Sequence, residues 1–219
     1  MELVLLGNGK MNRLVAELAA GQGHRVAKVI GRGDRWTAGW APDLVAIDFS
    51  VADAVLEHVD QSMAAGIPLV IGATGWLDQL EAVRALVDAS HVGAVYGANF
   101  SVGVQAFYRA VAAAAAALPA GYDSFVWEAH HREKRDAPSG TARHLAGLMR
   151  DAGHDPGSIA STRAGWLPGT HTAGFDSPDD TLTITHTARS RRGFAAGALL
   201  AAQWILGKRG LHEFSEVIP

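Results

Sequence analysis

A short apolar run near the start of the chain leads into a two-glycine turn and reads Leu3-Val4-Leu5-Leu6-Gly7-Asn8-Gly9-Lys10-Met11-Asn12. Leu14, Val15 and Leu18 follow at helical spacing, so the stretch predicts a strand, a tight turn and a helix. The glycines let the backbone approach a ligand closely, and the helix start offers N–H donors to a phosphate. A two-glycine motif taken alone also fits an ordinary strand-to-helix turn.

The same order of elements recurs through the first hundred residues. We expect strands at 24–30, 44–50, 69–71 and 91–96 and helices at 51–65 and 76–89. Strands that alternate with helices favour a parallel sheet covered on both faces, and this order resembles the Rossmann-like dinucleotide-binding fold. Gly7, Gly31, Gly72 and Gly97 each follow a predicted strand, so one shared cofactor cleft is expected at the carboxyl ends of the strands.

The end of the second strand bears on the choice of cofactor. An acidic residue there usually binds the ribose hydroxyls, whereas an arginine suits a 2′-phosphate. The sequence has Gly31-Arg32-Gly33-Asp34, which favours NADPH with Lys10 and Arg32 as phosphate partners. Both side chains would otherwise be solvated surface charges.

A second stretch, from Trp127 to Ala142, gathers side chains that transfer protons: Trp-Glu-Ala-His-His-Arg-Glu-Lys-Arg-Asp-Ala-Pro-Ser-Gly-Thr-Ala. A strand over 125–127 is expected to end at Glu128 or Ala129 and to direct His130 and His131 to opposite sides. Histidine titrates near neutrality, as a general acid must, and a buried lysine such as Lys134 can also give up a proton. A histidine pair can equally be structural or merely exposed.

The end of this stretch predicts a helix start that holds a small anion. Ser139 or Thr141 can cap a helix over 142–149, and Gly140 lets a ligand approach the free N–H groups. The plainer reading of Ser-Gly-Thr before a helix is a cap without a ligand.

Composition excludes several classes of protein. The chain has 219 residues, 48% of them hydrophobic, no cysteine and a net charge of −3 with interspersed charges. Nucleic acid and anionic membranes are therefore poor partners, and thiolate metal sites are excluded. Without an apolar run of about 18 residues or a signal-like start, the chain is expected to be a soluble cytoplasmic protein.

The second half is expected to form a different kind of domain. We predict a long helix that begins within 97–104 and runs to 118, loops over 152–180, and an antiparallel strand over 181–188. A final helix, from 194 to about 206, is expected to pack back on the first domain.

The run from His130 to Ala142 resembles the signature His-His-x-x-Lys-x-Asp-Ala-Pro-Ser-Gly-Thr-Ala of the dihydrodipicolinate (4-hydroxy-tetrahydrodipicolinate) reductase family. Asn99-Phe100-Ser101, the segment from Arg163 to His171, and Arg189-Ser190-Arg191 are also similar to that family. The chain departs from the pattern at Asn12, where the third glycine of the fingerprint is expected, and at Ala73, where the family has threonine.

The resemblance implies an enzyme with two domains: 1–101 plus 192–219 for the dinucleotide, and an α+β domain with a mixed sheet, 102–191, for substrate and oligomerisation. It implies reduction of 4-hydroxy-tetrahydrodipicolinate (dihydrodipicolinate) to tetrahydrodipicolinate by NADPH or NADH, in the diaminopimelate route to lysine. A homotetramer that binds a small dicarboxylate, without a metal, is the expected form.

The resemblance also implies residue roles. His130 would be the acid/base residue and Lys134 the proton donor. Substrate would be bound by His131, Ser139, Gly140, Thr141 and Arg191. The residues expected to bind the cofactor are Gly7, Asn8, Gly9, Lys10, Met11, Arg32, Gly72, Ala73, Thr74, Gly97, Ala98, Asn99 and Phe100.

Three alternatives remain open from the sequence. A related NAD(P)H-dependent reductase could act on another small imine or keto acid. A hydrolase or metal enzyme could use Ser139, His130 and His131, although the sequence has neither a Gly-x-Ser-x-Gly elbow around Ser139 nor His-x-x-x-His spacing. A nucleotide sensor without catalysis would have no use for the proton-donor cluster.

Overall fold

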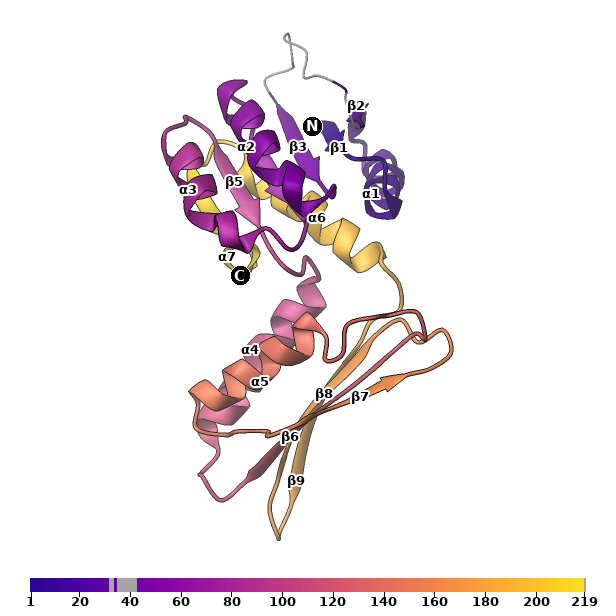
Figure 1. Cartoon of the computed structure of the whole chain (residues 1–219), viewed down its shortest axis with the longest axis vertical. Coiled ribbons are helices and arrows are strands. Elements are labelled where there is room, and N and C mark those ends of the chain that lie inside the picture. The colour runs from indigo at the N-terminus through magenta and orange to yellow at the C-terminus, as the bar shows by residue number, and fades with distance from the viewer. Residues whose placement is uncertain (32–33, 35–42, 219) are drawn as a thin grey trace. The chain divides into compact units, whose positions relative to one another are not determined.

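The computed structural model describes residues 1–31, 34 and 43–218. The chain forms two compact units, one of Met1–Ser101 with Arg191–Pro219 and one of Val102–Ser190. Figure 1 shows the helices and strands of both units, coloured by residue number. No helix in the described part is long and apolar enough to cross a membrane.

The first unit contains a six-stranded sheet in the order β10-β5-β4-β3-β1-β2, in which every strand pair is parallel. Its strands are β1 (Glu2–Leu6), β2 (Arg25–Ile30), β3 (Leu44–Asp48), β4 (Leu69–Ile71), β5 (Gly93–Tyr96) and β10 (Gly210–Glu213). The first five lie where the apolar runs predicted them. The edge strand β10 was not predicted, because Gly-Leu-His-Glu has no hydrophobic run.

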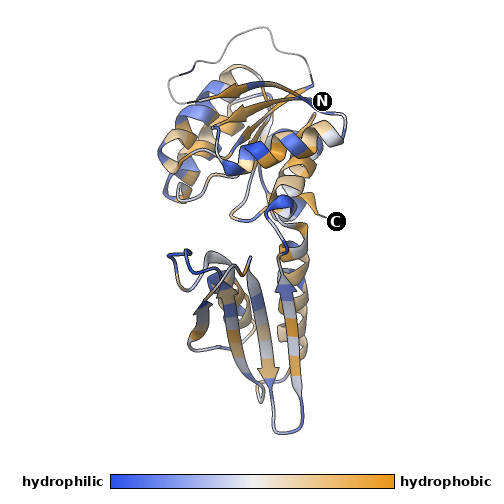
Figure 2. Ribbon diagram, turned by 90° about the vertical axis from the view of Figure 1, so that its right-hand side faces the viewer, coloured by the Kyte–Doolittle hydropathy of each residue, from blue (hydrophilic) through white to orange (hydrophobic). Residues whose placement is uncertain are grey.

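Helices cover both faces of this sheet, as the strand–helix alternation predicted. They are α1 (Lys10–Gly21), α2 (Val55–Ala64), α3 (Leu80–Asp88), α6 (Arg192–Ile205) and α7 (Phe214–Val217), with short 3₁₀ turns at Ala52–Ala54 and Leu77–Gln79. Leu5 belongs to a core with α1 and α6, whereas its neighbour Leu6 belongs to a core with α2 and α3. Strands buried on both faces read as continuous apolar runs, which are orange in Figure 2.

Helix α6, which was expected as the final helix, packs within the first unit, as expected, and approaches the segment after β5 very closely. A Cβ atom at Gly197 of α6 would lie 1.7 Å from the carbonyl oxygen of Phe100. The Phe100 ring is buried between Phe49 and Phe214, at centroid distances of 6.1 and 4.6 Å. Glycine at 197 therefore sets the distance between α6 and the segment that follows β5.

The second unit is a four-stranded mixed sheet in the order β7-β6-β8-β9. Its strands are β6 (Asp123–His130), β7 (Ile159–Arg163), β8 (Thr170–Asp176) and β9 (Thr181–Thr187), and only β7 runs parallel to its neighbour. Helices α4 (Val102–Ala117) and α5 (Gly140–Asp151) lie side by side on one face (Figure 1), over a core that includes Phe107, Leu145 and Phe175. The predicted α/β class with a second, mixed sheet is confirmed.

Two predictions for this unit were wrong and a third was confirmed. Two strands, β7 and β8, lie within 152–180, where only loops were expected; their side chains are mostly small or polar, so pairing with β6 rather than a hydrophobic pattern defines them. β6 continues to His130 instead of ending at Glu128 or Ala129, because Ala129 pairs on both sides and His130 still pairs with Arg163 of β7. The long helix predicted to begin within 97–104 and to run to 118 is confirmed: it begins at Val102, after a turn in which Asn99 accepts a hydrogen bond from the Ser101 N–H, and it ends at Ala117.

Candidate active site

A row of polar side chains crosses the second sheet on the face that carries α4 and α5. Glu128 of β6 aligns with Ser161 of β7 on one side and with His171 of β8 on the other. His171 in turn aligns with His186 of β9. His130 follows Glu128 by two residues, so its side chain emerges on the same face.

Glu128 is the centre of this row, and its side chain is fully buried. Its Oε1 accepts hydrogen bonds from Arg163 Nη2 at 2.6 Å and from Ser161 Oγ at 2.8 Å. The Ser139 N–H donates to both carboxylate oxygens, at 3.1 and 3.2 Å. Burial alone would raise the pKa of Glu128, but the hydrogen bonds from Ser139, Arg163 and Ser161 outweigh it and lower that pKa to about 2.

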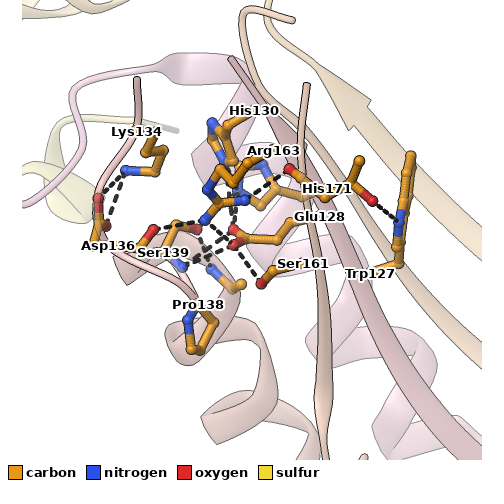
Figure 3. Close-up of polar contacts among 12 residues, drawn as sticks. Trp127, Glu128, His130, Lys134, Asp136, Pro138, Ser139, Ser161, Arg163 and His171 are labelled. Atoms are coloured by element: carbon orange, nitrogen blue, oxygen red, sulfur yellow. Dashed lines mark hydrogen bonds and ion pairs between the residues drawn. The ribbon is translucent and has the colours of Figure 1, made fainter. Parts of the chain in front are cut away.

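Two imidazoles meet beside the second oxygen of Glu128 (Figure 3). The Nε2 atoms of His130 and His171 are 3.2 Å apart, and they lie 3.3 and 3.5 Å from Glu128 Oε2. Burial lowers the pKa of His130, although the Glu128 carboxylate opposes that shift. Burial, and then repulsion from His130, lower the pKa of His171 to about 4. Both rings are therefore mainly neutral at pH 7 when no ligand is bound.

The loop after β6 holds the predicted lysine. The Lys134 Nζ donates to both oxygens of Asp136, at 2.7 and 2.9 Å (Figure 3). The Lys134 N–H donates to the carbonyl of half-buried His131 at 3.1 Å. This turn places the ammonium group and the two histidines in one short segment.

The start of α5 has the features of an anion site. Ser139 is the N-cap, and its hydroxyl accepts the Ala142 N–H at 3.2 Å. A Cβ atom at Gly140 would meet no described atom within 4 Å, so a ligand has room beside this backbone. The Thr141 hydroxyl is hydrogen-bonded to Tyr108 of α4. The prediction that Ser139 or Thr141 caps the helix is thus confirmed for Ser139.

In the first unit, the turn between β1 and α1 leaves room for a phosphate group. Gly7 has φ +93°, and a Cβ atom there would lie 3.3 Å from the Ser50 Cα. Gly9 is the N-cap of α1, and no side chain caps that helix within the described structure. Exposed Asn8 and Lys10 flank these free N–H groups, so this turn fits the pyrophosphate of a dinucleotide.

Asn12 explains how the chain tolerates the loss of the third glycine. Its side chain is buried, and Nδ2 donates to the carbonyls of Leu6 and Gly7, both at 2.7 Å. The amide thereby fixes the end of β1 and the first glycine of the turn. Asn12 therefore departs from the glycine pattern but preserves the turn through its two side-chain hydrogen bonds.

Most of the remaining predicted cofactor residues lie after β4 and β5, at the same edge of this sheet, and Met11 lies in α1. A Cβ atom at Gly72 would overlap the Phe49 ring, at 2.1 Å, so Phe49 requires glycine there. Ala73 is buried; its N–H donates to the Asp48 carbonyl and its carbonyl accepts from Trp76 Nε1. Of the others, Thr74 and Ala98 are exposed, Met11 and Asn99 are partly exposed, and Gly97 and Phe100 are buried.

Two predicted residues remain. Arg32 lies outside the described residues. Arg191 is exposed and belongs to the first unit, where it is the N-cap of α6. The structure thus gathers His130, His131, Lys134, Ser139, Gly140 and Thr141 in the second unit and does not place Arg191 among them.

Sequence reasoning missed the surroundings of His130: Glu128, His171 and Gly169 contact its ring, and Ser161 and Arg163 bond to Glu128. A Cβ atom at Gly169, whose φ is +136°, would lie 3.1 Å from the His130 ring. No polar–apolar alternation in Thr170-His-Thr-Ala marks β8, and the contact between His171 and Glu128 depends on strand register.

The structure bears on the hydrolase and metal alternatives. Ser139 Oγ lies 3.1 Å from His171 Nε2, but Glu128 approaches that same nitrogen, whereas a Ser-His-acid triad needs the acid on the other ring nitrogen. Donor atoms of Glu128, His130 and His171 lie within 4.8 Å of one another. The Arg163 cation already neutralises this carboxylate, so we assign no ion to the cluster.

Comparisons with known proteins agree over the whole chain. The family model described as dihydrodipicolinate reductase, N-terminus, matches residues 1–100, and the one described as dihydrodipicolinate reductase, C-terminus, matches residues 103–218. The 4-hydroxy-tetrahydrodipicolinate reductase of Christiangramia forsetii is 33% identical over 100% of this chain and 98% of its own length. The enzyme of that name from Neisseria meningitidis serogroup A is 38% identical over 80% of this chain and 72% of its own.

A solved structure has the same fold. Dipicolinate-bound dihydrodipicolinate reductase from Paenisporosarcina sp. TG-14 aligns with a TM-score of 0.82 at 20% identity, over 100% of this chain and 99% of that chain. The predictions of the family, of an enzyme and of a nicotinamide cofactor are confirmed, since the family uses NADH or NADPH. The chain therefore belongs to the dihydrodipicolinate reductase family.

Proposed function

We propose that this protein reduces 4-hydroxy-tetrahydrodipicolinate, or dihydrodipicolinate after loss of water, to tetrahydrodipicolinate in the diaminopimelate route to lysine. The observation that carries the proposal is the segment 130–142. There a buried imidazole, an ammonium group and an open helix start lie together, within the segment that matches the family signature. A cyclic imine with two carboxylates needs those three groups.

A bound NADPH or NADH supplies the hydride. The residues that would hold it are the turn from Gly7 to Met11 and the segments 72–74 and 97–100, with Arg32 and Lys10 on a 2′-phosphate. The uncapped start of α1 supports the first of these assignments, because it leaves N–H groups free for the pyrophosphate. Ala73 and Phe100 would contribute mainly through backbone and shape, since both side chains are buried.

His130 would act as the acid/base residue and Lys134 as the proton donor. Hydride addition to the ring builds negative charge on the substrate, and a proton must neutralise it. The Asp136 carboxylate holds the Lys134 ammonium beside the loop, and Gly169 leaves space for the His130 ring. The dicarboxylate would favour a proton on His130, because an anion beside an imidazole raises its pKa.

One substrate carboxylate would lie at the start of α5. Gly140 and Thr141 would bind it through backbone N–H groups and a hydroxyl, while Ser139 orients both by capping the helix. His131 would contact the substrate, and Arg191 would pair with a carboxylate. The proton can reach the substrate ring only if the helix start holds the substrate carboxylate in the right position.

The outer face of the second sheet supports a homotetramer as the form of the enzyme, and the biosynthetic role of the family favours the cytoplasm as its place of work. Helices α4 and α5 cover the opposite face, and Phe125 and Trp127 are 38% and 37% exposed. Hydroxyl groups of β8 and β9 pair across this surface, as those of Thr172 and Thr185 do at 2.9 Å. A face of this kind suits pairing with a second copy of the sheet.

A coupled assay tests the proposal. The purified protein is mixed with NADPH or NADH, and substrate is made in place by a synthase from pyruvate and aspartate semialdehyde. We expect loss of nicotinamide absorbance that requires the synthase and that falls sharply in a His130→Gln variant with unchanged cofactor affinity. Consumption of cofactor with other imines or keto acids but not with this substrate would overturn the proposal.

A further inference from the structure

A carboxylate outside the family signature organises the site in the second unit. Glu128 lies two residues before His130, yet its side chain contacts groups from β6, β7, β8 and the start of α5. We propose that Glu128 is a positioning residue of the reaction, which fixes both the proton-transferring His130 and the anion-binding start of α5. This inference rests on the proposed function.

The two carboxylate oxygens have different partners. Oε1 accepts from Arg163 Nη2, from Ser161 Oγ and from the Ser139 N–H, so donors surround it. Of these three donors, only the Ser139 N–H also bonds to Oε2, at 3.2 Å. Oε2 lies 3.3 Å from His130 Nε2. The hydrogen bonds from Ser139, Arg163 and Ser161 thus keep Glu128 ionised, while Oε2 faces the imidazoles of His130 and His171 at 3.3 and 3.5 Å.

The bond to Ser139 links this charge to the anion site. Ser139 supplies the first backbone N–H of the helix start, and the Ser139 hydroxyl caps α5. Gly140 and Thr141 follow directly. Any movement of the Glu128 carboxylate therefore shifts the backbone groups that would hold the substrate carboxylate and the imidazole that would transfer the proton.

The charged groups around His130 act in opposite directions. Burial, Lys134 from the loop after β6 and Arg163 from β7 all lower the pKa of His130, and Glu128 is the charge that raises it. His171 of β8 lies at 3.2 Å, His186 of β9 lies beyond His171, and the uncharged Ser139, the N-cap of α5, borders the cluster. Without the Glu128 charge, a proton on His130 would face two cations in a buried site.

The test measures His130 directly and does not need turnover. The pKa of His130 is followed by NMR of ring-labelled histidine, assigned from the signal missing in His130→Gln, in wild type, Glu128→Gln and Glu133→Gln. Glu133 is the matched control, because it undergoes the same chemical change on an exposed side chain in the adjacent loop. We expect Glu128→Gln to weaken proton binding by His130 roughly tenfold or more and Glu133→Gln to leave it unchanged.

Kinetics separate positioning from a purely structural role. In Glu128→Gln the decline of kcat with rising pH should move to lower pH and KM for the dicarboxylate should rise, while the Kd for NADPH stays the same. An unaltered His130 titration in folded Glu128→Gln would refute the proposal. If Glu128→Gln does not fold, Glu128→Asp replaces it as the test, because aspartate keeps the charge but draws it back by one methylene group. Wild-type kinetics and a wild-type His130 titration in Glu128→Asp would also refute the proposal.

These results can be told apart from a failure of the proposed reaction. If the wild-type protein does not consume NADPH with the dicarboxylate, the reaction assignment fails. The NMR titration would still decide whether Glu128 controls the proton on His130.

Discussion

Acid should weaken the second unit of this protein through one carboxyl group. On folding, the pKa of Glu128 falls from 4.5 to about 2. One pKa unit corresponds to about 1.4 kcal/mol, so the ionised group contributes about 3 kcal/mol to the free energy of unfolding at pH 7. Because the folded pKa is the lower one, this contribution is complete above about pH 4.5 and is lost as the pH falls toward 2, with about 1.5 kcal/mol left at pH 3.

Glutamine at 128 mimics the protonated acid, so Glu128→Gln isolates this effect. Wild type should exceed the variant by about 3 kcal/mol at pH 7, and the two should converge as the pH approaches 2. The assay is urea denaturation at several pH values, with hydrogen exchange of peptides from β6 and β8 reporting on the second unit alone. A difference that stays constant from pH 7 to pH 3 would show that shape, not the ionised carboxylate, stabilises this unit.

Three glycine substitutions test other parts of the account. Gly169→Ala should reduce kcat about tenfold or more with unchanged NADPH affinity, because the new Cβ would press on the His130 ring; wild-type kcat would contradict this. Gly140→Ala should preserve or slightly raise the melting temperature, since the space around Gly140 is open and alanine favours a helix. The same substitution should raise KM for the dicarboxylate, because the new methyl group would occupy the space beside the backbone where the substrate carboxylate would bind. An unchanged KM would show that Gly140 is not part of the anion site. Gly197→Ala should lower the free energy of unfolding by roughly 2 kcal/mol or more, because its Cβ would overlap the Phe100 carbonyl; unaltered denaturation in urea would exclude that close contact.

The sequence predicted the elements whose physical causes are local. Apolar runs such as Leu3–Leu6 are buried on both faces of the first sheet, and Ser139 caps α5 through a hydrogen bond to Ala142 three residues later. Both depend on neighbours in the chain. The signature around His130 could also be recognised from the sequence, because so many titratable residues seldom occur in so short a segment.

The elements that were missed depend on pairing between distant segments. β7 and β8 have too few large apolar side chains to be read as strands, and only their registers with β6 bring Ser161 and His171 to Glu128. Glu128 itself was read as the end of a strand, because a carboxylate in a buried strand makes sense only once Arg163 is known to pair with it. The role of Asn12 likewise requires the positions of two carbonyl oxygens.

The most direct test of the central claim is the fate of the hydride. The protein is supplied with substrate from the synthase and with NADPH or NADH carrying deuterium at C4 of the nicotinamide, and tetrahydrodipicolinate is examined by mass spectrometry. The account predicts one deuterium in the product, from one face of the nicotinamide only, and none when the protein is omitted. Product formed without deuterium from either face of the nicotinamide would contradict it.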